Sequence, residues 1–217
     1  MKVAIIGAGN VGTALATSIA RAGHDVIITS RDPGDAASTA AATGSRVAET
    51  NAAAAAEADV VIPAVAFRDV PEVVAEIAGA AAGKPVVDVT NRIGFGASGP
   101  EMDTTSSNAE ALAELLPGSP VVKAFNTLFA GNTANPQAFG FQLDSLFATD
   151  DDAAKDAVCG LSTSIGFRPI HVGPLAAARE LEAMAWLNIR LQMVSNGNWN
   201  TAFALVSPPE AALTYGK

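Results

Sequence analysis

The chain has 217 residues, of which 49% are hydrophobic and 6% aromatic, and its formal net charge at pH 7 is −9. This alanine-rich composition is typical of a globular protein and excludes a disordered chain, and no apolar run is long enough to cross a membrane. The negative charge argues against nucleic acid or an anionic membrane surface as a partner, because either would repel the average surface.

Residues 1–31 alternate between extended and helical patterns. Met1-Lys2 leads directly into a β-branched run, Val3–Ile6, which leaves no room for a signal peptide, so we expect a cytoplasmic protein. A glycine-rich turn follows, then good helix formers over Thr13–Ala22 and a second strand over Val26–Thr29. This order predicts a βαβ unit.

The turn between the first strand and the helix reads GAGNVG. Gly7 permits a tight turn, Gly9 lets the backbone approach a pyrophosphate, and Gly12 lets the helix pack closely on the strand. The first helical amides, at Asn10 and Val11, would face the phosphates at the positive end of the helix dipole. We therefore predict a dinucleotide site here in preference to a purely structural glycine turn.

Thr29, Ser30 and Arg31 stand at the end of the second strand, where such a site meets the adenosine ribose. An acidic side chain there would bind the ribose 2′-hydroxyl of NAD, whereas a hydroxyl and a guanidinium suit the 2′-phosphate of NADP. We therefore favour NADP(H) as the cofactor. Asp32 leaves NAD open, since it could be the ribose-binding acid shifted along the chain.

Two later strands are predicted to end beside the same cleft. The strand over Asp59–Val65 is apolar on both faces, which is typical of the middle of a parallel sheet, and its end places Val65 and Ala66 at the cleft. The next strand ends in Thr90 and Asn91. These two side chains are candidates for contacts near the nicotinamide ribose, or else they cap the following loop.

Short sequence motifs predict the turns, loops and helix caps between these elements. We expect a turn at Asp32–Asp35, an N-cap at Asn51 for an alanine-rich helix, and a glycine-rich loop beside the cleft at Gly94–Gly99. Ser107 and Glu110 fit a capping box at the start of a further helix.

Strand and helix patterns alternate up to a strand over Pro120–Phe125. This alternation predicts an α/β fold, a Rossmann-type doubly wound parallel sheet, over residues 1–130. The composition then shifts to Asn, Pro, Gln and Gly over Gly131–Phe141. We therefore assign residues 131–217 to a small C-terminal α+β extension that serves substrate binding and dimerisation.

The extension is predicted to contain a long helix over Leu175–Met193. Apolar residues lie on more than one face of this helix, which implies burial against the core and against something else, such as the second subunit of a homodimer. Asn198 and Trp199 follow in a polar stretch. The Trp199 ring could stack on a planar ligand or anchor an interface.

Side chains suited to catalysis are few, and no metal-binding or nucleophile motif is present. Cys159 fits a small core residue, and neither His24 nor His171 has an obvious acidic or nucleophilic partner nearby in the sequence. Tyr215 lies near the C-terminus, and Lys123 fits best a strand lysine that snorkels to the surface. With no catalytic side chain assigned, we favour direct hydride transfer between two bound cofactors.

The chain resembles the NADP oxidoreductases that depend on the deazaflavin coenzyme F420 and, more loosely, the N-terminal reductase domains of membrane ferric reductases. The resemblance covers nearly the whole chain in order. It rests on the segments GAGNVGTALA, TSRDP, VVKAFNT and DDDAAKDAVCGLSTSIGFRPIHVGPLAAARELE.

The resemblance implies roles for particular residues. Ser30 and Arg31 would hold the 2′-phosphate of NADP. The deazaflavin pocket, built in the family from the ends of later strands and the polar stretch after the last helix, would comprise Asn126, Leu128, Asn198 and Trp199. The chain departs from the family pattern after the fourth strand, at Ala66 and Arg68, and after the sixth, at Asn126.

These observations lead to one hypothesis and two alternatives. The first is an NADPH-dependent reductase that passes hydride directly to or from coenzyme F420 as its second substrate. The alternatives are an NADPH-dependent reductase of a flavin, a quinone or a small organic substrate, and a non-catalytic NADP-binding regulatory protein.

Overall fold

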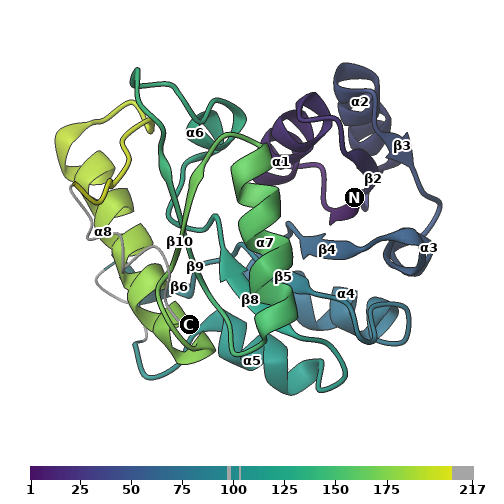
Figure 1. Cartoon of the computed structure of the whole chain (residues 1–217). Helices are drawn as coiled ribbons and strands as arrows, with labels where there is room; N and C mark the ends of the chain where they lie inside the picture. Colours follow the sequence, from purple (N-terminus) through teal and green to yellow (C-terminus); the bar gives the residue numbers. More distant parts are fainter. Residues whose placement is uncertain (97–98, 103, 207–217) are drawn as a thin grey trace.

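The structure, a computed structural model, describes residues 1–96, 99–102 and 104–206. Its strands are β1 (Lys2–Ile6), β2 (Asp25–Thr29), β3 (Arg46–Val47), β4 (Val60–Pro63), β5 (Val86–Asp88), β6 (Ile93–Gly96), β7 (Gly99–Met102), β8 (Val121–Ala124), β9 (Asp144–Ala148) and β10 (Arg168–His171). Eight of them form one sheet in the order β10-β9-β8-β5-β4-β1-β2-β3, with helices on both faces (Figure 1).

The sheet confirms the predicted doubly wound architecture. Strands β1 to β5 and β8 are parallel to one another, whereas β9 runs antiparallel to β8 and β10 runs parallel to β9. The chain goes from β1 outward to β2 and β3, then returns to the other side of β1 for β4, β5 and β8. This reversal opens a crevice at the carboxyl ends of β1 and β4, the place where open α/β sheets bind ligands.

Helices cover both faces of the sheet. The first face carries α1 (Asn10–Arg21), α2 (Pro33–Thr43) and α7 (Asp152–Ser164), and α6 (Ala130–Ala134) packs against α1. The second face carries α3 (Asn51–Glu57), α4 (Val70–Ile77), α5 (Asn108–Leu115) and the start of α8 (Ala178–Ser195). Two short 3₁₀ turns, η1 (Phe67–Asp69) and η2 (Leu175–Ala177), precede α4 and α8.

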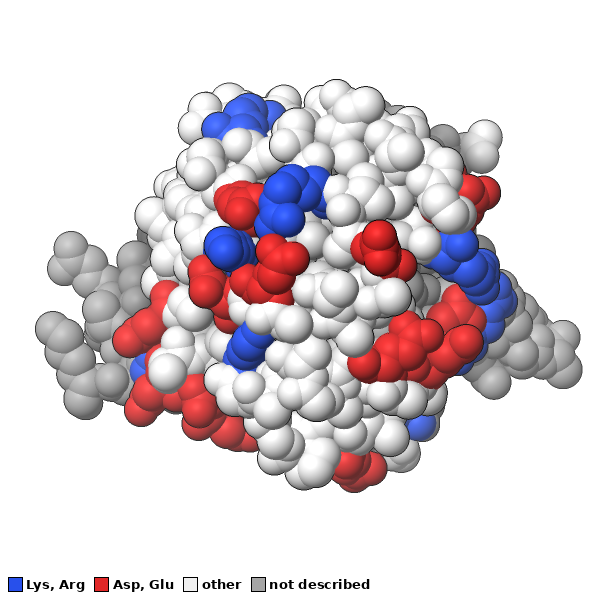
Figure 2. Space-filling view, turned by 90° about the vertical axis from the view of Figure 1, so that its right-hand side faces the viewer, with Lys and Arg blue, Asp and Glu red and all other residues white. Residues whose placement is uncertain are grey.

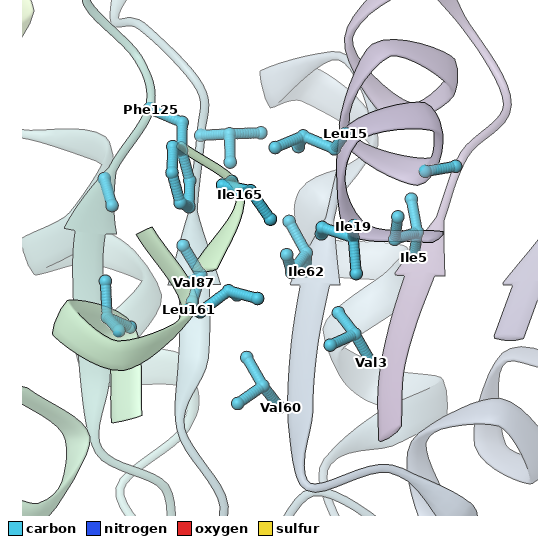
Figure 3. Close-up of a cluster of buried hydrophobic side chains, with 14 of the residues drawn as sticks. Val3, Ile5, Leu15, Ile19, Val60, Ile62, Val87, Phe125, Leu161 and Ile165 are labelled. Atoms are coloured by element: carbon cyan, nitrogen blue, oxygen red, sulfur yellow. The ribbon is translucent and has the colours of Figure 1, made fainter. Parts of the chain in front are cut away.

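Alternating strand residues supply the two cores. On β1, Val3 and Ile5 face the α1 side, whereas Ala4 and Ile6 face the α4 side. Figure 3 shows the first of these cores, in which Leu15 and Ile19 of α1 lie over β1. Further along the sheet, Leu161 of α7 and Ile165, which directly follows that helix, complete the same cluster beside Val87 and Phe125.

Two helix starts differ from the prediction. Asp32 is the N-cap of α2, because its Oδ1 accepts a hydrogen bond from the Gly34 amide at 2.8 Å, and Pro33 begins the helix. The predicted turn at Asp32–Asp35 is therefore the first turn of a helix, where proline is well tolerated. Thr50, rather than Asn51, caps α3 by accepting from the Ala53 amide at 3.0 Å.

The predicted glycine-rich loop at Gly94–Gly99 was wrong. Strands β6 and β7 pair antiparallel with Ile93 opposite Met102 and Gly96 opposite Gly99, and residues 97 and 98 lie outside the described part of the chain. Backbone hydrogen bonds hold such a ladder together, so glycines weaken a strand without excluding it.

The sheet continues across the boundary predicted at residue 130. Strand β9 pairs with β8, and its Phe147 joins the same buried cluster as Val3. A later segment of the chain is tied to the starts of β9 and β10. Asp144 accepts hydrogen bonds from Arg168 and from the Leu205 amide, and Arg168 donates to the Leu205 carbonyl.

Charged side chains on the β3 side of the molecule occur in mixed groups. Figure 2 shows basic and acidic residues beside one another, with uncharged surface between the groups. One such group joins Arg46 to Asp25 at 3.5 Å and to Glu57 at 3.0 Å. This face therefore lacks the broad basic field that nucleic-acid binding requires. None of the described helices has the length and apolar character needed to cross a bilayer.

The predicted capping box is confirmed and also ties α5 to α8. Ser107 and Glu110 exchange hydrogen bonds at the start of α5. Arg179 of α8 donates two hydrogen bonds, of 2.8 and 2.6 Å, to the Glu110 carboxylate. The hydrogen bond from Arg179 lowers the pKa of Glu110 to about 2 from its usual 4.5. The folded protein therefore resists protonating this carboxylate, and the stabilisation is lost as the pH falls from 4.5 towards 2.

We predict that Glu110→Gln lowers the free energy of unfolding by about 1 kcal/mol near neutral pH, since the pair is partly open to solvent and screened. The loss should shrink towards about pH 3, where the wild-type contribution itself fades. Urea unfolding followed by circular dichroism at the two pH values measures both effects. Glu114→Gln, at an exposed position of the same helix, is the control. An equal loss at both pH values would contradict the prediction.

Candidate functional site

The glycine turn has the close contacts that the sequence predicted. Gly7 has a φ of +113°, and a Cβ there would lie 2.4 Å from the Ala64 carbonyl oxygen of the neighbouring strand end. A Cβ on Gly12 would lie 1.9 Å from the Gly7 carbonyl oxygen. At Gly9 a Cβ would meet nothing within 4 Å, so open space lies above the turn at this position.

Helix α1 begins at this open space without a capping side chain. Gly9 is its N-cap, and Asn10 and Val11 are exposed. The first turn carries no acidic residue, so its amides and the positive end of the helix dipole face outward. Together with the cradle formed by Gly7 and Gly12, this arrangement fits a pyrophosphate.

The end of β2 presents one exposed cation. The Arg31 side chain is 91% exposed, and Ser30 beside it is half-buried. Thr29 is buried and donates its hydroxyl to Asn51 Oδ1 at 2.6 Å, so this side chain positions Asn51. Because one carboxylate oxygen of Asp32 caps α2, Arg31 is the more available group for a ribose substituent.

The ends of β4 and β5 face the same edge. Val65 is half-buried, and its methyl group would touch a Cβ on Gly7 at 3.2 Å, whereas Ala66 is exposed. Thr90 is buried, with its amide and hydroxyl both donated to Asp88 Oδ1 at 2.9 and 2.7 Å. Asn91 is half-buried and donates to the Asn126 carbonyl at 3.3 Å.

The prediction that Lys123 snorkels to the surface was wrong. Its side chain is 0% exposed, and its Nζ lies 2.7 Å from a carboxylate oxygen of Asp88 and 2.7 Å from one of Glu182. Nζ also donates to the Thr90 carbonyl at 2.5 Å. Helices cover both faces of β8, so the ammonium group has no path to water and is neutralised inside the protein instead.

Glu182 connects this buried triad, Lys123–Asp88–Glu182, to two further segments. Its carboxylate accepts the backbone amide of Arg92, at the start of the β6–β7 hairpin, and that of Asn108, at the start of α5. Burial raises the pKa of Glu182, while the Lys123 ammonium acts in the opposite direction. One side chain of α8 therefore fixes the ends of several elements around the cleft.

Asn126 is held at the end of β8 by its side-chain amide. Its Nδ2 donates to Asn91 Oδ1 at 2.8 Å and to the Leu181 carbonyl at 3.1 Å, while its buried Oδ1 has no hydrogen-bond partner among the described residues. The preceding residue, Phe125, has a φ of +60°, a conformation that costs energy for a large side chain. A buried acceptor therefore lies unused at the cleft edge.

The polar stretch after α8 returns to the same region. The Trp199 ring, half exposed, packs edge-on against Phe129 with 5.4 Å between centroids. Gln192 of α8 accepts the Trp199 amide at 3.0 Å and donates to the Thr201 hydroxyl at 2.6 Å. Asn198 is exposed, whereas Leu128 is 8% exposed.

Both histidines lie away from this edge. His24 sits between the amino-terminal amine and Ser164, at the amino end of β2, and burial lowers its pKa. His171 packs against Phe147 at the far end of β10. Cys159 is half-buried against the first core cluster, and Tyr215 lies outside the described residues. Within the described ranges, no group of three or more His, Cys, Asp or Glu side chains is placed to hold a metal ion.

The arrangement thus brings two sets of predicted residues to the carboxyl edge of the parallel strands. One set surrounds the glycine turn and the end of β2, and the other surrounds the ends of β5 and β8. The fold and this edge define a Rossmann-type dinucleotide-binding protein.

Comparisons with known proteins give the family. The family model for NADP oxidoreductase, coenzyme F420-dependent, matches residues 2–92. The F420-dependent NADP reductase of Methanothermobacter marburgensis is 33% identical over an alignment of 227 positions, gaps included, which covers 97% of this chain and 100% of that protein. The chain therefore belongs to the F420-dependent NADP reductase family, and it is an NADP-dependent oxidoreductase.

Two further similarities agree with this placement. The crystal structure of a candidate F420-dependent NADP reductase from Arthrobacter sp. FB24 matches with a TM-score of 0.83 at 28% identity, covering 95% of this chain and 99% of the other. Metalloreductase STEAP3 of Rattus norvegicus is 34% identical over 184 residues, or 84% of this chain. The matched region spans only 36% of the length of that metalloreductase.

We predict that Lys123→Met lowers the free energy of unfolding by about 3–5 kcal/mol, because it leaves two buried carboxylates facing each other without a counter-ion. Urea denaturation measures the loss. Adding Glu182→Gln to this variant should recover part of it, since one of the two charges is removed. Lys155→Met removes a surface pair whose partner Asp152 is 93% exposed and serves as the control. A Lys123→Met protein within about 1 kcal/mol of wild type would contradict this account.

Proposed function

We propose that this protein transfers hydride directly between NADPH and coenzyme F420. The observation that carries the nucleotide half is the glycine turn, where Gly9 faces open space above the uncapped start of α1. The acceptor half is supported by membership of a family whose relatives are named F420-dependent NADP reductases.

Different residues around the turn bind different parts of the nucleotide. Gly7, Gly9 and Gly12, with the amides at Asn10 and Val11, bind the pyrophosphate. Ser30 and Arg31 hold the 2′-phosphate, and Thr29 acts through Asn51. The nicotinamide half lies along the strand ends that follow, contacted by Val65, Ala66, Thr90 and Asn91.

The second substrate lies against the nicotinamide, on the side formed by the described part of the C-terminal extension, residues 131–206, and the end of β8. The unused Asn126 Oδ1 supports a ligand there, because a buried acceptor without a partner costs free energy until it is satisfied. The exposed Trp199 ring, held by Phe129 and Gln192, offers a flat surface for stacking. Leu128 and Asn198 complete this proposed site.

The chain orients the two reactants and needs no side chain that transfers a proton. When bound, the cofactors supply the chemistry: NADPH gives up a hydride to become NADP⁺, and the oxidised deazaflavin takes up that hydride and one proton from solvent. Lys123, the one lysine near the cleft in the described chain, is fully buried in its triad. The role of Lys123 is therefore to position Thr90 and the ends of the strands.

Turnover tests the acceptor. We expect purified protein with NADPH and oxidised F420 to bleach the visible absorbance of the deazaflavin, and Trp199→Ala to raise the KM for F420 while leaving that for NADPH unchanged. A matched exposed position, Phe139→Ala, should alter neither constant. No turnover of F420 above background, with NADPH oxidised instead by a flavin or a quinone, would replace the proposed acceptor.

For the nucleotide, we predict that Arg31→Ala weakens NADPH binding by roughly 1.5–3 kcal/mol, the range of a charge-assisted hydrogen bond, and barely affects NADH. Calorimetric titration with both nucleotides measures this difference. Gly9→Ala is the matched control: the fold has room for its methyl group, which would obstruct the pyrophosphate and weaken both nucleotides alike. Equal losses for both nucleotides with Arg31→Ala would assign the selection to another group.

The outer face of α8 supports a homodimer. Leu187, Leu191 and Val194 form one stripe along this face with exposed fractions of 53, 46 and 78%. The buried side of the helix combines apolar residues such as Leu181 with polar ones such as Glu182, so the stripe is a second apolar surface that faces solvent. A stripe on a two-fold axis can pack against its own copy, which would bury it.

We predict that the wild-type protein is a dimer at micromolar concentration and that Leu187→Glu, which places like charges at the shared face, yields a folded monomer. Light scattering coupled to gel filtration measures the mass, and Leu115→Glu, at an exposed apolar position on α5, should leave the dimer intact. A monomeric wild-type protein would refute the dimer.

A further inference from the structure

A second arginine lies close to Arg31, contributed by the segment after β4. Asp69, in η1, places its Oδ2 at 4.0 Å from Arg31 Nη1 and its Oδ1 at 3.5 Å from Arg68 Nε. Arg31 follows β2 and Asp69 follows β4, and these strands flank β1 and its glycine turn. The three charged groups therefore span the crevice beside the turn.

The Asp69 carboxylate has no other role in the described contacts. The residue precedes α4 as its N-cap, yet its side chain makes no capping hydrogen bond. Its exposed fraction is 30%, against 91% for Arg31 and 83% for Arg68. The carboxylate thus lies behind two guanidinium groups that extend into solvent, and the group of three carries a net charge of +1.

This local charge contrasts with the rest of the molecule. The chain carries a formal net charge of −9, so its average surface repels a cofactor that bears several phosphate charges. Binding then depends on cations placed where the anion arrives. The ion pair engages Arg68 through Nε, which leaves its two terminal amino groups for a further acceptor.

We propose that Arg68 is a second specificity-determining residue, which together with Arg31 binds the 2′-phosphate of NADP(H). This inference rests on the proposed function, since it requires the nucleotide to lie over the glycine turn. A phosphate monoester carries close to two negative charges and accepts paired N–H bonds from guanidinium groups. Asp69 keeps the two guanidinium groups together without contacting the phosphate itself.

Because Arg68 lies on the surface, its substitution can change nucleotide binding without changing the stability of the fold. An exposed pair between adjacent residues contributes little to folding, so Arg68→Ala should unfold at the same denaturant concentration as wild type. Arg68→Lys keeps the charge but loses the planar fork. Arg21→Ala, in the last turn of α1 at the opposite end of the helix, is the matched control for loss of one positive charge.

Calorimetric titrations with NADPH, NADH and 2′-AMP test the proposal. For Arg68→Ala we expect about a tenfold weaker binding of NADPH and 2′-AMP, with NADH unchanged, and for Arg68→Lys an intermediate loss. Arg31→Ala combined with Arg68→Ala should abolish the preference for NADPH, and Arg21→Ala should keep it.

Two outcomes overturn the inference and are distinguishable from each other. If wild type prefers NADPH, and Arg68→Ala retains that preference while Arg31→Ala loses it, Arg31 alone selects the cofactor and only this inference fails. If wild type binds neither NADPH nor NADH, the proposed function fails together with it.

Discussion

A lysine ammonium group without access to solvent lies between two carboxylates at the centre of this protein, and the cleft edge depends on it. Lys123 joins β8 to β5 through Asp88 and to α8 through Glu182. A buried charge is tolerated only when it is paired and its hydrogen bonds are satisfied, which restricts all three elements to one relative placement. The ends of β5 and β8, where the second substrate is proposed to bind, are therefore held in fixed positions relative to α8.

Helix α8 extends the same principle along its length. Its inner face carries Glu182, Asn188 and Gln192, and the last two hold the returning chain at Thr201. The helix therefore contributes polar anchors to the site and leaves apolar side chains on its outer face. Because Leu181 and Ala185 are buried beside these polar groups while Leu187 and Leu191 are exposed, the sequence of the helix shows apolar residues on several faces.

Local patterns in the sequence sufficed for the order of the strands in the main parallel sheet and for the glycine turn, because both depend on short-range geometry. The buried pair had a sequence signal as well. Residues 85–88 read PVVD and residues 120–123 read PVVK, and the two strands pair with Asp88 directly opposite Lys123. Two charges at the same position of two apolar strands indicate neighbours in a parallel sheet.

Other features could not be predicted locally. Glu182 lies 59 residues from Lys123, and its inward direction depends on how α8 is rotated about its axis. The contact of Arg31 with Asp69 requires two loops from either side of β1 to meet, which no spacing in the chain encodes. The β6–β7 hairpin was missed because its glycines suggest a loop, whereas its pairing needs only the backbone.

The two edges of the sheet have a consequence for the solubility of the protein. Unpaired strand edges act as templates on which other chains can add. Strand β3 has only two residues, and β10 carries Pro169, which lacks an amide hydrogen, beside the Asp144–Arg168 pair that binds the backbone of Leu205. A chain shortened upstream of Leu205 would lose the backbone partners of this Asp144–Arg168 pair at the start of β10, next to the longer edge.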